Sequence, residues 1–208
     1  MLLSFLGLLI QANMVTSRPW SDCHGIAPFE EEAESVANYT SKYYDAFYFE
    51  NWPKSDIIEG SLPVADIWYF SGHGGKNWYG KPYLIAGDNK KIYGDDIPYL
   101  RYQHEFYEMR FAYASACYSA HTSFWPWVKN LHDGFMEQGA QSYMGWKKSV
   151  YYSTSYTFTN RFYDYAINEM MDVETAKYFA EQDVPAADGN IRIFVESGQT
   201  VHLIPWWG

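Results

Sequence analysis

Short apolar runs, separated by polar stretches that carry glycine or proline, dominate the hydrophobic pattern of the chain. Three of them predict strands: Val64–Phe70, which is rich in residues that favour β-strands, Arg110–Ala116 and the short Ser142–Trp146. Because strands buried on both faces appear as continuous apolar runs, we expect the first two to be buried strands. A fourth run, Ile191–Val195, predicts a last strand near the end of the chain.

Helical periodicity fills much of the sequence between these runs. Apolar and aromatic residues recur near helical spacing from Pro28 to about Phe49, and again over a longer stretch from Ser153 to about Gln182. Asp95 and Asp96 predict the start of a helix that runs to about Glu108. One more helix is expected from Phe124 to Gln138, where Gly139 would end it.

Turn signals complete the pattern and indicate the fold class. Asn51 to Leu62 is acidic and carries proline, which predicts a loop, and two β-like runs around Gly87-Asp88-Asn89 predict a hairpin over Tyr83–Tyr93. Strands then alternate with helices for most of the chain. This order is typical of an α/β fold with a mostly parallel sheet and helices on both faces. Ligands of such sheets bind at the carboxyl ends of the strands.

Composition narrows the class of protein. The 208 residues are 48% hydrophobic and 19% charged, which is typical of one globular domain. The net charge of −10 and the absence of a long Lys/Arg cluster argue against a nucleic-acid partner. Aromatic residues reach 20% of the chain, and such rings either fill a core or line grooves that bind peptides or sugars.

The first residues form a segment of their own. Met1–Ile10 is almost wholly apolar, too short to span a bilayer, and of the length found in secretory signal peptides, although no positive charge precedes it. We expect residues 1–20 to be a signal peptide or N-terminal extension and residues 21–208 to be the domain; a buried strand or a misassigned start codon are the alternatives. A signal peptide would place the protein outside the cell or at its surface. No stable membrane insertion is expected.

Two residues stand where a parallel sheet would place a catalytic pair. His73 and Cys117 each come just after a predicted buried strand, so they would emerge at the same edge if those strands are neighbours. An imidazole can accept the thiol proton, and the thiolate can attack an amide carbonyl to form a thioester that water hydrolyses. The backbone N–H groups of Gly74 and Cys117 are candidate oxyanion donors. Glycine at 72 and 75 would let the backbone approach a substrate closely.

Plainer interpretations of these residues remain open. A cysteine after an apolar strand is usually a small buried hydrophobic residue, and a histidine in a glycine loop is often a turn residue. His121 lies four positions from Cys117, but on the far side of the expected turn. Cys23-His24 has no second ligand pair, so we expect no metal and no cofactor. Two cysteines make no disulfide framework, and whether Cys23 pairs with Cys117 stays open.

Two motifs carry a resemblance to a known family. Phe70-Ser-Gly-His-Gly-Gly75 and Ala114-Ser-Ala-Cys-Tyr-Ser-Ala120 resemble the caspase-like clan (CD) of cysteine peptidases, which includes caspases, legumains, separases, gingipains and CHAT-domain proteases. The two residues are 44 positions apart, against about 50 in caspases. The predicted hairpin with Asp95–Leu100, and the segment Gly139–Gly145, look most like gingipain and CHAT domains.

The resemblance implies a caspase-like three-layer sandwich and a role for each residue. It assigns His73 as base and acid, Cys117 as nucleophile and Gly74 as oxyanion donor. Family members place substrate-pocket residues after the strand that follows the cysteine, which makes Trp146 a pocket wall by position. The caspase sequence Gln-Ala-Cys-Arg-Gly is absent, so the resemblance implies no preference for aspartate.

Three functions are compatible with these features. We expect a cysteine endopeptidase that acts on a peptide or protein substrate through a His-Cys dyad. A catalytically silent caspase-like interaction or surface module is the alternative, and it predicts an unreactive Cys117. A transpeptidase or amidase would use the same dyad and differ only in its products. No oligomeric state follows from the sequence.

Overall fold

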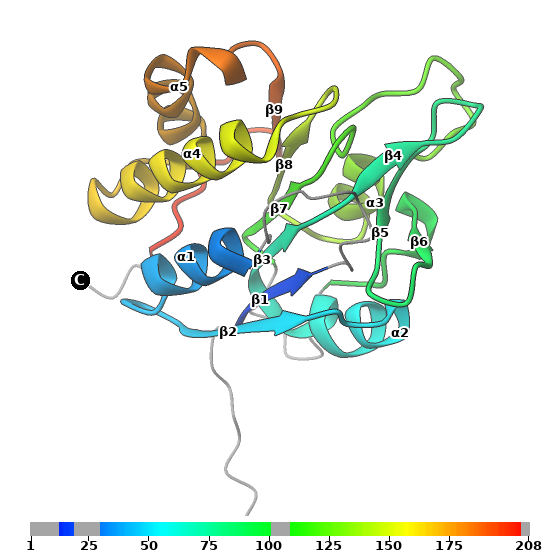
Figure 1. Cartoon of the computed structure of the whole chain (residues 1–208), viewed down its shortest axis with the longest axis horizontal. Helices are drawn as coiled ribbons and strands as arrows, with labels where there is room; N and C mark the ends of the chain where they lie inside the picture. Colours follow the sequence, from blue (N-terminus) through cyan, green and yellow to red (C-terminus); the bar gives the residue numbers. More distant parts are fainter. Residues whose placement is uncertain (1–12, 19–29, 101–108, 205–208) are drawn as a thin grey trace, which may run out of the picture.

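The computed structural model of the chain describes residues 13–18, 30–100 and 109–204. Figure 1 shows a central sheet with helices packed on it and a smaller sheet at one side. The elements, in chain order, are β1 (Asn13–Arg18), α1 (Glu30–Thr40), β2 (Asp45–Glu50), α2 (Lys54–Asp56), η1 (Ile57–Ser61), η2 (Leu62–Val64), β3 (Ala65–Ser71), β4 (Gly74–Lys76), β5 (Pro82–Ile85), β6 (Lys91–Ile92), η3 (Gly94–Asp96), β7 (Phe111–Ser115), α3 (Leu131–Glu137), β8 (Ser142–Trp146), α4 (Tyr152–Tyr163), η4 (Asp164–Asn168), α5 (Val173–Asp183), η5 (Pro185–Ala187) and β9 (Ile191–Val195).

The central sheet has the strand order β2-β1-β3-β7-β8-β9. Every neighbouring pair is parallel except β8 and β9, which run antiparallel. Helices α1, α4 and α5 gather on one face, while α2 and α3 lie toward the other (Figure 1). The mixed α/β class and the mostly parallel sheet predicted from the sequence are therefore confirmed.

The alternation of side chains along β3 shows how one strand contributes to two cores. Ile67 and Tyr69 pack with the helices α1, α4 and α5, whereas Trp68 and Phe70 pack with α3 and the turns after α2. All four side chains have 0% exposure. Because successive side chains point to opposite faces of a strand, a run that is apolar at every position needs cover on both faces. The result is a helix–sheet–helix sandwich.

Two segments between α1 and β3 differ from the prediction. The helix predicted to about Phe49 ends at Thr40, whose hydroxyl donates to the carbonyl of Val36 at 2.9 Å. The aromatic run that follows is the strand β2, which pairs with β1, because β-forming residues at an exposed sheet edge gain a ladder that a longer helix would not give. The predicted loop up to Leu62 is helical instead, and its apolar residues Ile57 and Leu62 are buried.

The helices later in the chain are shorter than predicted. The helix expected from Phe124 begins at Leu131, after an Asn130 cap whose N–H donates to Asp133 at 2.8 Å. The long helical stretch from 153 to 182 is divided into α4 with η4 and a separate α5, because the backbone turns at Met170 with φ of 56°. Of the helix predicted to about Glu108, residues 94–96 form one 3₁₀ turn, and residues 101–108 lie outside the described residues.

Strand β1 lies within the segment expected to be a signal peptide or N-terminal extension. Residues 13–18 pair in parallel with β2 on one side and β3 on the other. A buried strand is one of the alternatives for the N-terminal segment, and residues 13–18 form a strand. Residues 1–12 lie outside the described part of the chain, and the expected location outside the cell stays a prediction. None of the helices described in the structure is long and apolar enough to cross a membrane.

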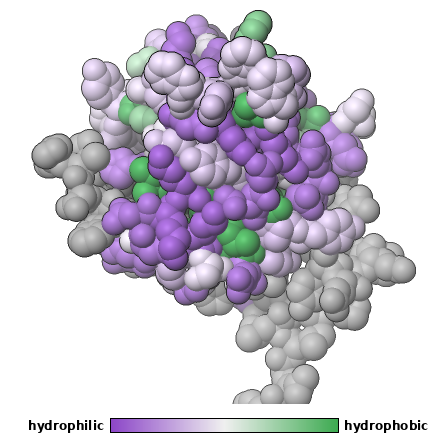
Figure 2. Space-filling view, turned by 90° about the vertical axis from the view of Figure 1, so that its right-hand side faces the viewer, coloured by the Kyte–Doolittle hydropathy of each residue, from purple (hydrophilic) through white to green (hydrophobic). Residues whose placement is uncertain are grey.

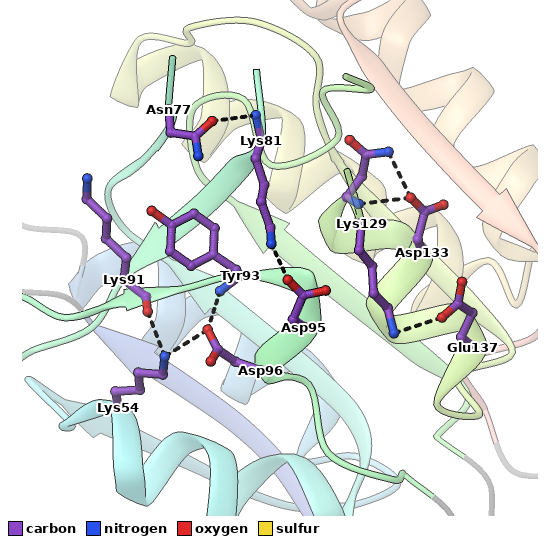
Figure 3. Close-up of polar contacts among 11 residues, drawn as sticks. Lys54, Asn77, Lys81, Lys91, Tyr93, Asp95, Asp96, Lys129, Asp133 and Glu137 are labelled. Carbon is purple, nitrogen blue, oxygen red and sulfur yellow. Dashed lines mark hydrogen bonds and ion pairs between the residues drawn. The ribbon is translucent and has the colours of Figure 1, made fainter. Parts of the chain in front are cut away.

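The smaller sheet joins β4, β5 and β6 in antiparallel order. Its β5–β6 pair confirms the hairpin predicted around Gly87-Asp88-Asn89. Figure 3 shows how side chains fasten it: Lys54 pairs with Asp96 at 2.7 Å, and Lys81 pairs with Asp95. The Lys81 ammonium also lies 5.1 Å from the centre of the Tyr93 ring. These contacts tie α2 and the start of β5 to the segment that follows β6.

Candidate active site

The register between β3 and β7 sets the positions of His73 and Cys117. The two strands are parallel neighbours, and their last paired residues are Ser71 and Ser115. Each candidate residue therefore lies two positions beyond the same rung of the ladder. Gly72 extends the pairing by one bond, because its N–H donates to the carbonyl of Ser115 at 3.1 Å. Since neighbouring strands are about 4.8 Å apart, both residues leave the sheet at one edge.

Gly74 brings the His73 loop against Cys117. A Cβ atom placed on Gly74 would lie 2.5 Å from the Cys117 carbonyl oxygen and 3.0 Å from the Ala116 Cβ. No side chain fits in that space, so glycine is required for the close approach. On the other side, the carbonyl of His73 accepts the N–H of Ile85 at 3.0 Å, which ties the loop to β5.

The environment of His73 favours an imidazole that can accept a proton. The side chain is half-buried. Burial lowers the pKa of His73 below its ordinary value of 6.5, because the charged form loses hydration. At neutral pH the ring is therefore mostly neutral, which is the form a general base needs.

Cys117 lies at the start of a tight turn. It carries a free thiol that is partly exposed, whereas Ala116 before it is 1% exposed. The thiol sulfur accepts the Val150 N–H at 3.5 Å and lies 3.8 Å from the carbonyl oxygen of the same residue. The next residue, Tyr118, has a left-handed backbone with φ of 62°. This partial exposure does not fit the interpretation of Cys117 as a buried core residue.

The end of β8 supports that turn through backbone groups. The carbonyl of Trp146 accepts the N–H of Ala120 at 2.9 Å, and its own N–H donates to the Ser119 hydroxyl at 2.9 Å. The Trp146 ring has 0% exposure and meets Phe158 edge-on at 5.6 Å. The side chain therefore packs in the core beneath α4 and offers no surface to a ligand, so its burial gives no support to the predicted role as pocket wall.

The other two glycines of the motif lie on either side of His73. Gly72 is buried at the end of the β3–β7 ladder. Gly75 belongs to β4, where a Cβ atom would lie 2.7 Å from the Tyr83 hydroxyl, so the phenol ring covers this backbone. A direct contact of either glycine with substrate stays a prediction.

His121 has a different set of neighbours. Its ring meets the Tyr118 ring edge-on with centres 6.0 Å apart, and the Lys76 ammonium lies 4.9 Å from the centre of the same Tyr118 ring. Burial, and then the positive charge of Lys76, lower the pKa of His121. Within residues 13–18, 30–100 and 109–204, no three His, Cys, Asp or Glu side chains gather as a metal site would require.

A buried carboxylate lies beneath this edge of the sheet, and no sequence pattern marks it. Glu32 is 1% exposed and accepts hydrogen bonds from the hydroxyls of Ser71 and Ser115, the rung that precedes His73 and Cys117. In the sequence it stands in a run of glutamates at the start of a helix, where acidic residues are ordinarily exposed and favour the helix dipole. Only the packing of α1 on the sheet distinguishes it.

Aromatic side chains project from the two loops that follow His73 and Cys117. Trp78 in the β4–β5 turn is 96% exposed, and Phe124 and Trp127 after the Cys117 turn are 92% and 70% exposed. The loops are joined, since the Ser123 hydroxyl donates to the Tyr79 carbonyl at 2.7 Å. The side of the molecule that carries β4–β6 is otherwise largely hydrophilic, with small separate hydrophobic patches (Figure 2).

Comparison with known proteins finds likeness in structure and none in sequence. No family model matches the chain, and no curated protein sequence matches it. The crystal structure of gingipain R, an Arg-specific cysteine proteinase, has a TM-score of 0.64 at 8% identity over 94% of this chain. This chain spans about half of that protein, 48% of its length.

Caspases give a similar result over more of their length. The Drosophila initiator caspase Dronc has a TM-score of 0.54 at 9% identity, with 92% of this chain and 82% of that chain covered. Caspase-1 from Spodoptera frugiperda has a TM-score of 0.52 at 12% identity, with 93% and 89% covered. At such low identity these likenesses establish the fold alone.

Proposed function

Because the chain has the caspase-like fold of clan CD cysteine peptidases, we propose that it is a cysteine endopeptidase with His73 and Cys117 as its dyad. The observation that supports this most strongly is the shared rung of the ladder, which puts both residues two positions past the paired Ser71 and Ser115. The close approach of Gly74 to the Cys117 carbonyl is a second support, because it brings the two loops into contact. Ligands of parallel sheets bind at this edge.

The proposed reaction follows from the two side chains. His73 takes the proton of the Cys117 thiol, and the thiolate attacks the carbonyl carbon of a peptide bond. The tetrahedral intermediate collapses when the C–N bond breaks and His73 returns the proton to the leaving amine. Water, deprotonated by His73, then attacks the thioester; the C–S bond breaks, the new carboxylate is released, and His73 returns the proton to the Cys117 sulfur. The N–H groups of Gly74 and Cys117 would stabilise the oxyanion, each donor contributing about 3 kcal/mol.

The substrate proposed for this site is an extended peptide or an unfolded protein segment. The exposed rings of Trp78, Phe124 and Trp127 stand on the loops that leave His73 and Cys117, where a bound chain would extend. Aromatic rings bind peptide side chains by burying apolar surface. The arginine preference named for gingipain R belongs to that protein and is no part of this proposal.

Product analysis with cysteine variants tests the proposal. The chain is incubated with an unfolded protein and with a peptide library, and the products are sequenced by mass spectrometry. We expect cleavage of internal peptide bonds that leaves free carboxylates, and a loss of at least about 10³-fold in Cys117→Ala. Cys23→Ala is the matched control and should keep the activity.

Three results would contradict this function. Cleavage that continues at the same rate in Cys117→Ala would exclude the thiol as nucleophile. A folded wild-type chain that cleaves nothing would leave the silent interaction module as the better account. Joined peptides in place of free carboxylates would instead identify a transpeptidase that uses the same dyad.

A further inference from the structure

A single carboxylate accepts hydrogen bonds from hydroxyl groups on three elements of the sandwich. Glu32, near the start of α1, is 1% exposed. Its oxygens accept hydrogen bonds from Ser71 on β3 at 3.0 Å, Ser115 on β7 at 2.7 Å, and Ser155 and Thr159 on α4 at 3.1 Å and 2.7 Å. Burying a carboxylate is unfavourable unless hydrogen bonds replace its hydration, and the surrounding hydroxyl groups supply them.

The donors belong to the segments that surround the thiol. Ser71 precedes His73 by two residues, and Ser115 precedes Cys117 by two residues. Ser155 lies in the first turns of α4, just after Val150, whose N–H and carbonyl contact the Cys117 sulfur. One side chain thus connects all three segments, on the face of the sheet that α1 and α4 cover.

The connection restricts the directions of these hydroxyl groups. A serine has one hydroxyl proton, so Ser71, donating to Glu32, has none left for another acceptor. Ser115 and Ser155 also hydrogen-bond to each other, so their two protons are shared between Glu32 and the pair, and this packs β7 against α4. The negative charge of Glu32 also affects Tyr69 on β3. Burial, and then the charge of Glu32, raise the pKa of Tyr69 well above its ordinary value.

We propose that Glu32 is a positioning residue for the dyad, holding the ends of β3 and β7 and the start of α4 in register so that the His73 imidazole meets the Cys117 thiol. This inference rests on the proposed function. Glu32 contacts neither the substrate nor the reacting atoms, and acts through Ser71, Ser115 and Ser155.

The reactivity of Cys117 measures the alignment without any knowledge of the substrate. Iodoacetamide labelling of Cys117 is followed by peptide mass spectrometry in wild type, His73→Ala, Glu32→Gln and Glu31→Gln. The amide of Glu32→Gln keeps the shape but presents N–H groups to hydroxyls that were donating. Because a displacement of about 1 Å can reduce a rate about 100-fold, we expect Glu32→Gln to slow labelling by about 10- to 100-fold. Its pH profile should move toward that of His73→Ala.

Glu31→Gln is the matched control. Glu31 is the preceding residue of the same helix and is exposed, so its neutralisation changes the charge of α1 equally without touching the hydroxyls. Its labelling rate should equal that of the wild type.

A second pair of variants separates positioning from stability. Ser115→Ala and Thr159→Val each remove one donor from the same oxygen of Glu32. Ser115 lies two residues before Cys117, whereas Thr159 lies on α4, nine residues beyond Val150. We expect Ser115→Ala to slow labelling and Thr159→Val to leave it unchanged, whatever each does to the melting temperature. This pair decides the question if Glu32→Gln fails to fold.

The outcomes keep the two proposals apart. Labelling of the wild type that does not depend on His73 would overturn the dyad, and the positioning role with it. Labelling that depends on His73 but is equally fast in folded Glu32→Gln would overturn the positioning role alone. Equal slowing in Ser115→Ala and Thr159→Val would also overturn it, since a purely structural carboxylate predicts that result.

Discussion

At the scale of single residues, the site depends on one backbone position that can carry no side chain. Gly74 lies so close to the Cys117 carbonyl that a Cβ atom would be 2.5 Å from its oxygen. Backbone hydrogen bonds hold the His73 loop to the neighbouring strands, so the loop cannot easily move away from Cys117. The approach of the His73 loop to Cys117 therefore depends on glycine at 74.

Gly74→Ala should separate the two loops. We expect a loss of about 1–3 kcal/mol in the free energy of unfolding, typical of overpacking, and Cys117 labelling slowed by at least about tenfold. Urea unfolding and labelling kinetics measure the two effects. Gly60→Ala is the control, because a Cβ there meets nothing within 4 Å. A Gly74→Ala protein with wild-type stability and reactivity would show that the contact is unimportant.

Residue types alone could identify only part of the site. His73 and Cys117 were found because each stands after an apolar run, one in a glycine loop, and a parallel sheet brings such positions to one edge. Glu32 was missed, because a glutamate at a helix start looks the same whether it faces solvent or a sheet. Trp146 is assigned by its position at the end of β8, but the direction of its side chain depends on which face of that strand α4 covers.

At the scale of elements, strands buried on both faces could be predicted best. The limits of β3 and β7 lie within about one residue of the predicted runs, because cover on both faces leaves nearly every position apolar. The limits of β8 and of the edge strand β9, where Arg192 is exposed, match their predicted runs as well. Strand β2 was predicted as helix since the spacing of Tyr43 and Phe47 suits both structures, and only the neighbouring strand β1 decides. The break between α4 and α5 depends on a left-handed residue, Met170, that no local sequence signal marks.

At the scale of the whole molecule, burial of histidines couples stability to pH. Burial lowers the pKa of His73, and also of His132, whose ring stacks on Phe194 at 3.9 Å. The unfolded chain then binds more protons than the folded chain as pH falls below the unfolded value of about 6.5. Stability is therefore fully present above that pH and is lost as the pH falls toward the lowered folded values.

A melting series tests this coupling. We expect the melting temperature to fall between pH 7.5 and pH 5.5, and His132→Asn to show a smaller fall because it lacks one of the titrating groups. The acidic residues with lowered pKa, Asp88 and Asp172, would lose their contribution only below about pH 4, outside this window. A melting temperature that is constant or rises on acidification to pH 5.5 would contradict the histidine burial described here.

The central claim is that His73 activates Cys117, and the pH dependence of Cys117 labelling tests it most directly. Labelling with iodoacetamide is measured from pH 5 to pH 9 in the wild type and in His73→Ala. The account predicts rapid labelling of the wild type well below the ordinary thiol pKa of about 8.5, and a profile in His73→Ala that rises only near that value. Profiles that coincide in the two proteins would contradict the dyad.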